Sequence, residues 1–303
     1  MRVHHLNCIS TCPLGGKLMD DGPESVVQRG HLTNHCLLIE EAGDLVLVDT
    51  GLGLRDVADP QSRLSRFFLN LVSPEFRKEM TACRQLRRMG FNPADVRHIV
   101  LTHLDFDHAG GLDDFPNAIV HMLESERDAA FAQATWLDRQ RFRPQQWSTL
   151  GNWRVYQPDE GDSWFGFNRV RSLEGLSEDI VLVPLLGHTL GHAGVAVRVA
   201  DRWLFQAGDA YFFHGEIDLQ HPHCTPGLTF YQRMMDKDHK LRVSNQDRLR
   251  ELRRSRAYEV EVFCAHDVVE FERLSGGSGE VPADRIVPRG RTGTVTGSRA
   301  YGD

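Results

Sequence analysis

A nine-residue segment rich in metal-ligand side chains, residues 103–111, constrains this chain more than any other feature. It reads His-Leu-Asp-Phe-Asp-His-Ala-Gly-Gly and holds four candidate ligands: His103, Asp105, Asp107 and His108. Imidazole nitrogens and carboxylate oxygens together are typical ligands of zinc, manganese or iron. Alternate residues of an extended segment point to the same side, which favours convergence on one ion. The alternative is a polar turn in which Asp107 caps a helix.

Length, charge and hydropathy narrow the class of protein. A chain of 303 residues fits one large domain or two small ones. A net charge of -7 argues against nucleic acid or an anionic membrane as the main partner. No apolar run reaches about 18 residues, so we expect no transmembrane helix. Residues 1–7 lack an apolar signal core, which favours a cytoplasmic protein.

Short apolar runs bounded by turn residues predict a series of buried strands. The strands are expected at residues 36–40, 45–49, 96–102, 118–122, 180–184, 194–200, 203–207 and 259–264, and helices at 79–89, 124–133 and 246–257. Residues 55–80 read as a mobile or partly helical insertion, or as a helix packed on the core. Residues 136–164 read as irregular. An exposed Phe67–Phe68 loop predicts a homodimer contact.

Further ligand-type residues follow three of these strands. His188 lies in the Gly-flanked turn 185–192, Asp209 follows strand 203–207, and His266 follows strand 259–264. Taken singly, such a histidine is more often a core or capping residue, and an aspartate after glycine is usually a turn former. Loops at one edge of a sheet are where sites are built, however, so we expect these side chains to join the 103–108 cluster.

In this order, the motifs resemble the metallo-β-lactamase superfamily over about residues 1–270. The matching segments are Asp49-Thr-Gly, Thr102–Gly111, Gly187–His192, Gly208-Asp209 and Ala265-His-Asp. The sequences of segment 105–111, of Gly-Asp-Ala-Tyr and of Ala-His-Asp are most similar to those of the N-acyl-homoserine lactonase branch. The resemblance implies an α+β fold, a four-layer αβ/βα sandwich, over residues 1–273. We expect the Gly/Ser/Arg-rich tail, 274–303, to be flexible.

The resemblance also implies a site for two divalent metal ions, with zinc expected first. One ion would be bound by His103, Asp105 and His188, the other by Asp107, His108 and His266, with Asp209 bridging both. A shared hydroxide would be the nucleophile. Asp49 would support the ligands from behind, or would be a simple turn residue. Tyr211 would donate a hydrogen bond to the developing oxyanion, or would be a core aromatic.

Asp105 departs from the family pattern, which has histidine at this position. Asp105 would bind the first ion directly, as a hard ligand that favours manganese or iron. Alternatively, its side chain would be too short and would leave a weak site, or it would contact a water molecule that is itself the ligand. Counted as a ligand, it makes two divalent ions, three carboxylates and a hydroxide neutral overall. A neutral set favours uncharged carbonyl substrates over anionic phosphodiesters.

The leading hypothesis is a metal-dependent hydrolase that cleaves a lactone, an ester or a related carbonyl group of a small, uncharged substrate. Asp107 and Tyr211 are the predicted catalytic residues. The alternatives are an iron-dependent oxidoreductase of the same fold, and a binding or regulatory protein that has lost a metal. Residues 55–80, 136–165 and 211–235 are expected to line the pocket and set specificity.

Overall fold

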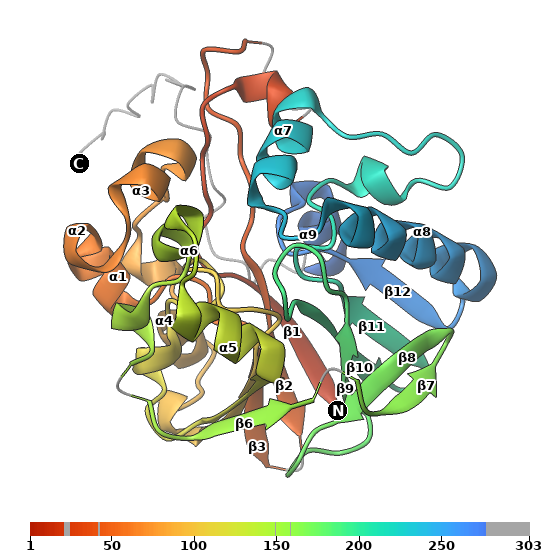
Figure 1. The fold of residues 1–303 in the computed structure, drawn as a ribbon. Coiled ribbons are helices and arrows are strands. Elements are labelled where there is room, and N and C mark those ends of the chain that lie inside the picture. The colour runs from red at the N-terminus through yellow and green to blue at the C-terminus, as the bar shows by residue number, and fades with distance from the viewer. Residues whose placement is uncertain (21–24, 42, 149, 158, 277–303) are drawn as a thin grey trace, which may run out of the picture.

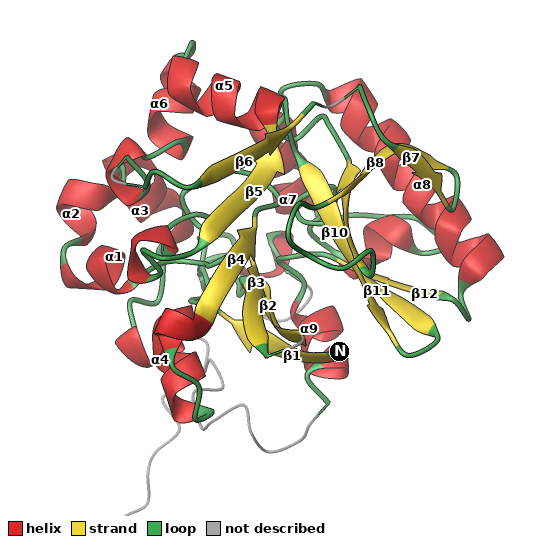
Figure 2. Ribbon diagram, turned by 90° about the horizontal axis from the view of Figure 1, so that it is seen from below, coloured by secondary structure: helices red, strands yellow, loops and turns green. Residues whose placement is uncertain are grey.

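The computed structural model describes residues 1–20, 25–41, 43–148, 150–157 and 159–276. Two six-stranded sheets form its centre (Figures 1 and 2). The first has the order β1-β2-β3-β4-β5-β6, and the second has the order β12-β11-β10-β9-β8-β7. The predicted tail lies almost entirely outside the described residues.

All eight predicted strands are present among the described residues, with small changes at their ends, whereas β1, β6, β7 and β8 were not predicted. In the first sheet they are β1 (Arg2–Asn7), β2 (His35–Glu41), β3 (Asp44–Val48), β4 (Val96–Val100), β5 (Ile119–Leu123) and β6 (Trp153–Tyr156). In the second they are β7 (Asp162–Trp164), β8 (Phe167–Ser172), β9 (Ile180–Pro184), β10 (Ala193–Val199), β11 (Arg202–Gln206) and β12 (Val260–Phe263).

Helices cover the outer faces of both sheets (Figure 2). The α-helices are α1 (Leu54–Ala58), α2 (Pro60–Arg63), α3 (Arg66–Val72), α4 (Ala82–Arg88), α5 (Glu124–Ala132), α6 (Trp136–Arg141), α7 (Pro226–Met235), α8 (His239–Arg256) and α9 (Val268–Leu274). The short 3-10 helices are η1 (Gly16–Leu18), η2 (Lys78–Met80), η3 (Pro93–Asp95), η4 (Leu112–Asp114), η5 (Pro144–Gln146) and η6 (His214–Ile217). Within the described residues, none of these helices combines the length and apolar character needed to cross a bilayer.

The layers follow from the two-residue period of the strands. In β2, Leu37 and Ile39 join an apolar cluster that also holds Val195 and Phe263 of the second sheet. Their neighbours Cys36 and Leu38 point the other way, into the cluster beneath α4 and α5. In the second sheet, Val260 and Val262 of β12 face Leu249 and Leu252 of α8. Both sheets are therefore buried on two faces, which gives the four-layer arrangement.

Three sequence predictions about individual segments are wrong. Residues 136–164 contain α6, η5, β6 and β7, which were missed because their apolar residues are few and interspersed with Arg and Gln. Helix α8 starts seven residues earlier than predicted, where the Asp238 side chain accepts a hydrogen bond from the Leu241 amide. Phe68 lies in α3 and is buried against Phe106, so Phe67 and Phe68 do not form the exposed loop that was predicted. The homodimer stays a prediction without that support.

Candidate metal centre

The seven predicted ligands lie together, at the edge where strands of both sheets end. Segment 103–108 follows β4, His188 lies in the turn after β9, Asp209 follows β11, and His266 follows β12. The described residues form two adjacent groups of potential ligands. The first group is His103, Asp105, His188 and Asp209, and the second group is Asp107, His108 and His266. All seven are at most 9% exposed.

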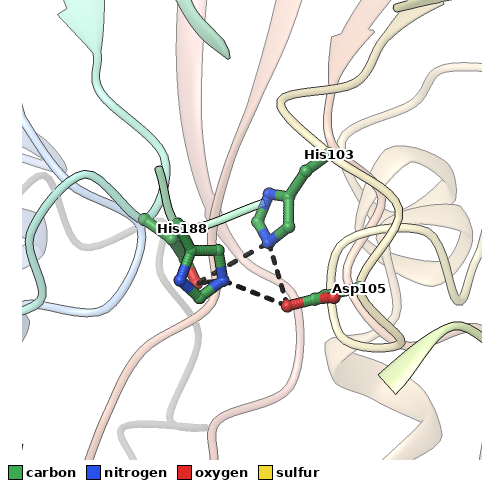
Figure 3. A group of neighbouring side chains, drawn as sticks. His103, Asp105 and His188 are labelled. Atoms are coloured by element: carbon green, nitrogen blue, oxygen red, sulfur yellow. Dashed lines mark hydrogen bonds and ion pairs between the residues drawn. The ribbon is translucent and has the colours of Figure 1, made fainter. Parts of the chain in front are cut away.

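The spacing of the first group fits a small cation. Asp105 Oδ2 lies 3.4 Å from His103 Nε2 and 3.1 Å from His188 Nε2 (Figure 3). Asp209 Oδ2 lies 3.7 Å from His103 Nε2 and 3.3 Å from His188 Nε2. Ligand bonds of roughly 2.0–2.1 Å in a tetrahedral arrangement separate the ligand atoms by about 3.3 Å. The four atoms are therefore placed as the ligands of one ion would be.

Asp209 connects the first group to the second. Its Oδ1 lies 3.2 Å from His108 Nε2 and 3.1 Å from His266 Nε2, whereas its Oδ2 faces the first group and also lies 3.3 Å from His266 Nε2. In the described part of the chain, His103 Nε2, His108 Nε2 and Asp209 Oδ1 are buried without a hydrogen-bond partner. Buried polar atoms are rarely left in this state unless an ion or water satisfies them. The donor set therefore fits two cations with Asp209 between them.

Oxygen atoms behind the histidines orient three of the four rings. His108 Nδ1 lies 2.9 Å from Asp49 Oδ2, and His266 Nδ1 donates to the Thr33 carbonyl at 2.8 Å. His103 Nδ1 lies 2.9 Å from the hydroxyl of Thr102, which itself donates to Asp49. These contacts leave each Nε2 free to bind a cation, as in many metal sites. Asp49 thus contacts His108 directly and His103 through Thr102, in addition to following the end of β3.

His192, which follows the first group's His188 in the same turn, holds Asp209 in place. Its Nε2 accepts a hydrogen bond from the Asp209 amide at 2.8 Å, and its Nδ1 donates to the Leu185 carbonyl at 2.9 Å. Burial lowers the pKa of His192 to about 3, so the ring is neutral and can accept. His192 is therefore a scaffold residue rather than a ligand.

Arg141 is the residue of this centre that sequence reasoning missed. It lies at the end of α6, is fully buried, and binds both oxygens of Asp105, with Nε–Oδ1 at 2.6 Å and Nη2–Oδ2 at 2.5 Å. Its sequence surroundings, Asp-Arg-Gln-Arg-Phe-Arg-Pro, look like a solvated stretch and gave no signal. Arg141 adds a positive charge beside Asp105, which the count of charges made from the sequence did not include.

The pKa values of two buried carboxyl groups, Asp105 and Asp209, are suited to binding cations. Burial disfavours the charged form of Asp105, but Arg141 and His103 outweigh it and hold the pKa of this carboxyl well below its ordinary value. Burial likewise opposes ionisation of Asp209, yet His266 and His108 keep its pKa well below the usual range. Both carboxylates are therefore ionised in the buried site, as metal ligands must be.

A family model described as the metallo-beta-lactamase superfamily matches residues 29–265. The chain belongs to this superfamily. A probable metallo-hydrolase of Mycobacterium tuberculosis is 37% identical over 272 residues, which cover 88% of this chain and 80% of that protein. An N-acyl homoserine lactonase of Bacillus cereus is 31% identical over 122 residues, 39% of this chain and 49% of the lactonase.

Solved structures show the same fold. The structure of an N-acyl homoserine lactone hydrolase, with the product N-hexanoyl-L-homoserine at its catalytic metal centre, aligns with a TM-score of 0.66. The alignment covers 89% of this chain and 95% of that chain at 20% identity. The predicted metallo-β-lactamase fold and the hydrolase class are thus confirmed, and the protein is a metallo-hydrolase of this superfamily.

The predicted catalytic tyrosine does not lie in the superfamily's metal centre. Tyr211 is fully buried in the cluster of the second sheet, and its hydroxyl donates to Glu270 at 3.0 Å. Its neighbour Phe212 turns toward the centre instead, with its ring centroid 4.6 Å from that of His266. Residues 210–213 do not continue β11, and the chain turns Tyr211 into the core, so the core-aromatic alternative describes this residue and the oxyanion role implied by the resemblance does not fit it.

An apolar pocket opens beside the second group. Its volume is about 210 Å³, and Asp107 and His266 reach it. Most of its other lining residues are apolar: Pro13, Leu14, Leu18, Met19, Leu32, Leu71, Val72, Phe212, Phe230, Tyr231 and Met234. The predicted segments 55–80 and 211–235 both contribute, but the lining among described residues includes none from 136–165. The contribution of residues 11–19 was missed because they carry no periodic pattern.

Glu126 ties together the two loops that carry the first group. One oxygen accepts from the Leu104 amide at 2.9 Å, and the other accepts from the Gly191 amide at 3.1 Å and the Thr189 hydroxyl at 2.5 Å. The turn packs so closely that a Cβ on Gly191 would lie 2.1 Å from the Glu126 nitrogen. We therefore expect Glu126 to fix the spacing of His103 and His188.

Replacing Glu126 by alanine should loosen the first group. Three buried donors lose their acceptor, so we expect a loss of about 2–4 kcal/mol in the free energy of unfolding. Misplaced ligands should also weaken metal affinity by about 10- to 100-fold. Urea unfolding and a chelator-competition assay measure the two effects. Glu124→Ala, two residues away on the same helix and partly exposed, is the control, and equal behaviour of both variants would refute this role.

Proposed function

We propose that this protein is a metal-dependent hydrolase that cleaves a lactone or carboxylic ester bearing an apolar chain. The observation that carries this proposal is the apolar pocket of about 210 Å³ into which Asp107 and His266 project. A carbonyl group held at those residues would have its hydrocarbon part in the pocket, which suits an uncharged substrate. The names of the similar lactonases support the same substrate class.

Two bound divalent ions would supply an activated water and polarise the substrate carbonyl. The seven ligands proposed from the sequence would hold them, and zinc suits the mixed imidazole and carboxylate set. Hydrolysis adds water across the acyl C–O bond, so one proton must reach the leaving oxygen. Asp107 combines a place among the ligands with access to the pocket, and we assign the transfer of this proton to its carboxylate.

Tyr231 takes the role that the sequence suggested for Tyr211. It lies on α7, lines the pocket together with Asp107, and packs on Phe212 with ring centroids 5.7 Å apart. Burial, followed by the negative charge of Asp107, raises its pKa well above the ordinary value, so the phenol keeps its proton. A protonated phenol at this place can donate a hydrogen bond to the oxyanion that forms on the substrate.

A substrate panel tests the proposal. Esters and lactones with acyl chains of increasing length should show kcat/KM rising by about fourfold per methylene, the effect of burying about 0.8 kcal/mol per CH₂, until the pocket is full. Tyr231→Phe should lower kcat/KM by about 10²-fold on every carbonyl substrate. Tyr258→Phe, an exposed residue outside the pocket, is the control.

Three outcomes would reject this function. Faster cleavage of phosphodiesters than of esters and lactones would identify a different substrate class. Iron with redox activity and no hydrolysis would favour an oxidoreductase. Protein that binds no metal and hydrolyses nothing would favour a binding or regulatory role. The metal content of protein made without added metal distinguishes an iron protein and a metal-free protein from a zinc or manganese hydrolase.

A further inference from the structure

Arg141 is bound into the first group by a rigid set of contacts. Its guanidinium forms a two-bonded fork with Asp105, and its Nη1 donates to the Met235 carbonyl at 2.6 Å. A planar guanidinium fixed at three points on a fully buried side chain cannot turn away without breaking charge-assisted hydrogen bonds. Its position beside Asp105 is therefore well determined by the surrounding chain.

The same guanidinium also contacts Nε2 of His188, the atom through which this histidine would bind a cation. Arg141 Nη2 lies 2.8 Å from His188 Nε2, the atom that faces Asp105 and Asp209. The Nδ1 of His188 is buried without a hydrogen-bond partner in the described residues, unlike the anchored Nδ1 atoms of His103, His108 and His266. An imidazole nitrogen has one lone pair, so Nε2 cannot accept from Arg141 and bind a cation at once.

We propose that the Asp105–Arg141 pair takes the place of a histidine in the first group and makes the two cation sites unequal. The inference rests on the proposed metal-dependent function. A cation enters the second group first, because its histidines are anchored at Nδ1 and their Nε2 atoms face the carboxylate of Asp209, whereas Nε2 of His188 contacts a guanidinium. A cation in the first group must displace Arg141 from His188 and binds more weakly, by roughly 10- to 100-fold, the effect of losing one charge-assisted hydrogen bond.

The charges of Asp105 and Arg141 have opposite effects on cation affinity, which distinguishes this inference from an effect of Asp105 alone. A carboxylate in place of a neutral imidazole would by itself strengthen cation binding. Arg141 cancels that charge, so the pair presents the first group with the same formal charge as a histidine. The weakness of the site is therefore assigned to Arg141, and removing its charge should tighten the site rather than loosen it.

Metal titration of the purified protein tests this directly. Metal-free protein is titrated with Zn²⁺ against a chromophoric chelator, and with Co²⁺ while its visible absorption is recorded. Wild type should bind two ions in two resolved steps. In Arg141→Met the weaker step should tighten by at least about tenfold, while the tighter step stays unchanged. Arg139→Met, on the same helix but exposed, should titrate like wild type.

Two further measurements keep the test decisive if Arg141→Met folds poorly. Metal-free Arg141→Met leaves the Asp105 charge buried and uncompensated, so its Tm should fall below that of wild type and recover when Zn²⁺ is added. The double variant Asp105→His with Arg141→Met restores a neutral pair and should bind two ions with affinities within about threefold of each other.

The outcomes that overturn the inference differ from those that overturn the function. Two equal binding steps in active wild-type protein, or loss of the second ion in Arg141→Met, would refute the inference while leaving a metal-dependent hydrolase. Wild-type protein that binds no metal and has no hydrolase activity would refute both.

Discussion

Replacing Asp209 by asparagine is expected to abolish hydrolysis and to lower the metal content of the protein. Asp209 is within 3.7 Å of the Nε2 atoms of all four candidate ligand histidines. The substitution keeps the volume of the side chain but removes the charge that both cation sites would share. Because such sites supply several kcal/mol of transition-state stabilisation, we expect kcat/KM to fall by about 10³-fold or more.

The measurement combines steady-state kinetics with elemental analysis of metal. Asp201→Asn, in the exposed turn between β10 and β11, is the matched control and should retain full activity and metal. Circular dichroism of each variant shows whether the fold is intact. A well-folded Asp209→Asn protein with wild-type turnover would show that the centre described here is not the place of reaction.

Removing the metals should cost a large part of the stability. The seven candidate ligands are buried carboxylates and imidazoles that face one another, and a bound cation would compensate for the clustering of their charges. A ligand present at 1,000 times its Kd stabilises the folded state by about 4.1 kcal/mol. For a chain of this size, we expect chelation to lower the Tm by roughly 10 °C.

Thermal unfolding with and without a chelator measures this effect. Zn²⁺ added in excess of the chelator should restore the Tm. Mg²⁺ should not, because it prefers oxygen ligands in octahedral geometry and four of the seven candidate ligands are histidines. An unchanged Tm after verified metal removal would contradict the proposed metal sites.

The layers of the fold were expected from the family resemblance, and short apolar runs placed eight of the described strands. Cys36, Leu37, Leu38 and Ile39 are all apolar, so only the structure shows that alternate side chains enter two different clusters. The segments that sequence reasoning missed, α6 and α7 among them, are short or carry mixed apolar and charged residues. Their conformation depends on the surfaces against which they pack.

The seven candidate ligands were proposed from the sequence because each follows a strand or lies in a glycine-flanked turn, and the structure places them together. What the sequence could not give was the direction of neighbouring side chains. Tyr211 is next to the site in sequence but lies in the core, whereas Tyr231, on a distant helix, lines the pocket with Asp107. Such assignments depend on how helices pack over the strand ends.

The sequence by itself pointed to the superfamily and to the seven candidate ligands, because these depend on short motifs, and the layers of the fold were expected from that resemblance. Only the tertiary structure decided what Asp105 contacts. Its partner Arg141 is 36 positions away and unremarkable in sequence, yet it is fully buried at 2.5 Å from the carboxylate. A charge buried by long-range packing changes the electrostatics of a metal centre in a way that no local pattern records.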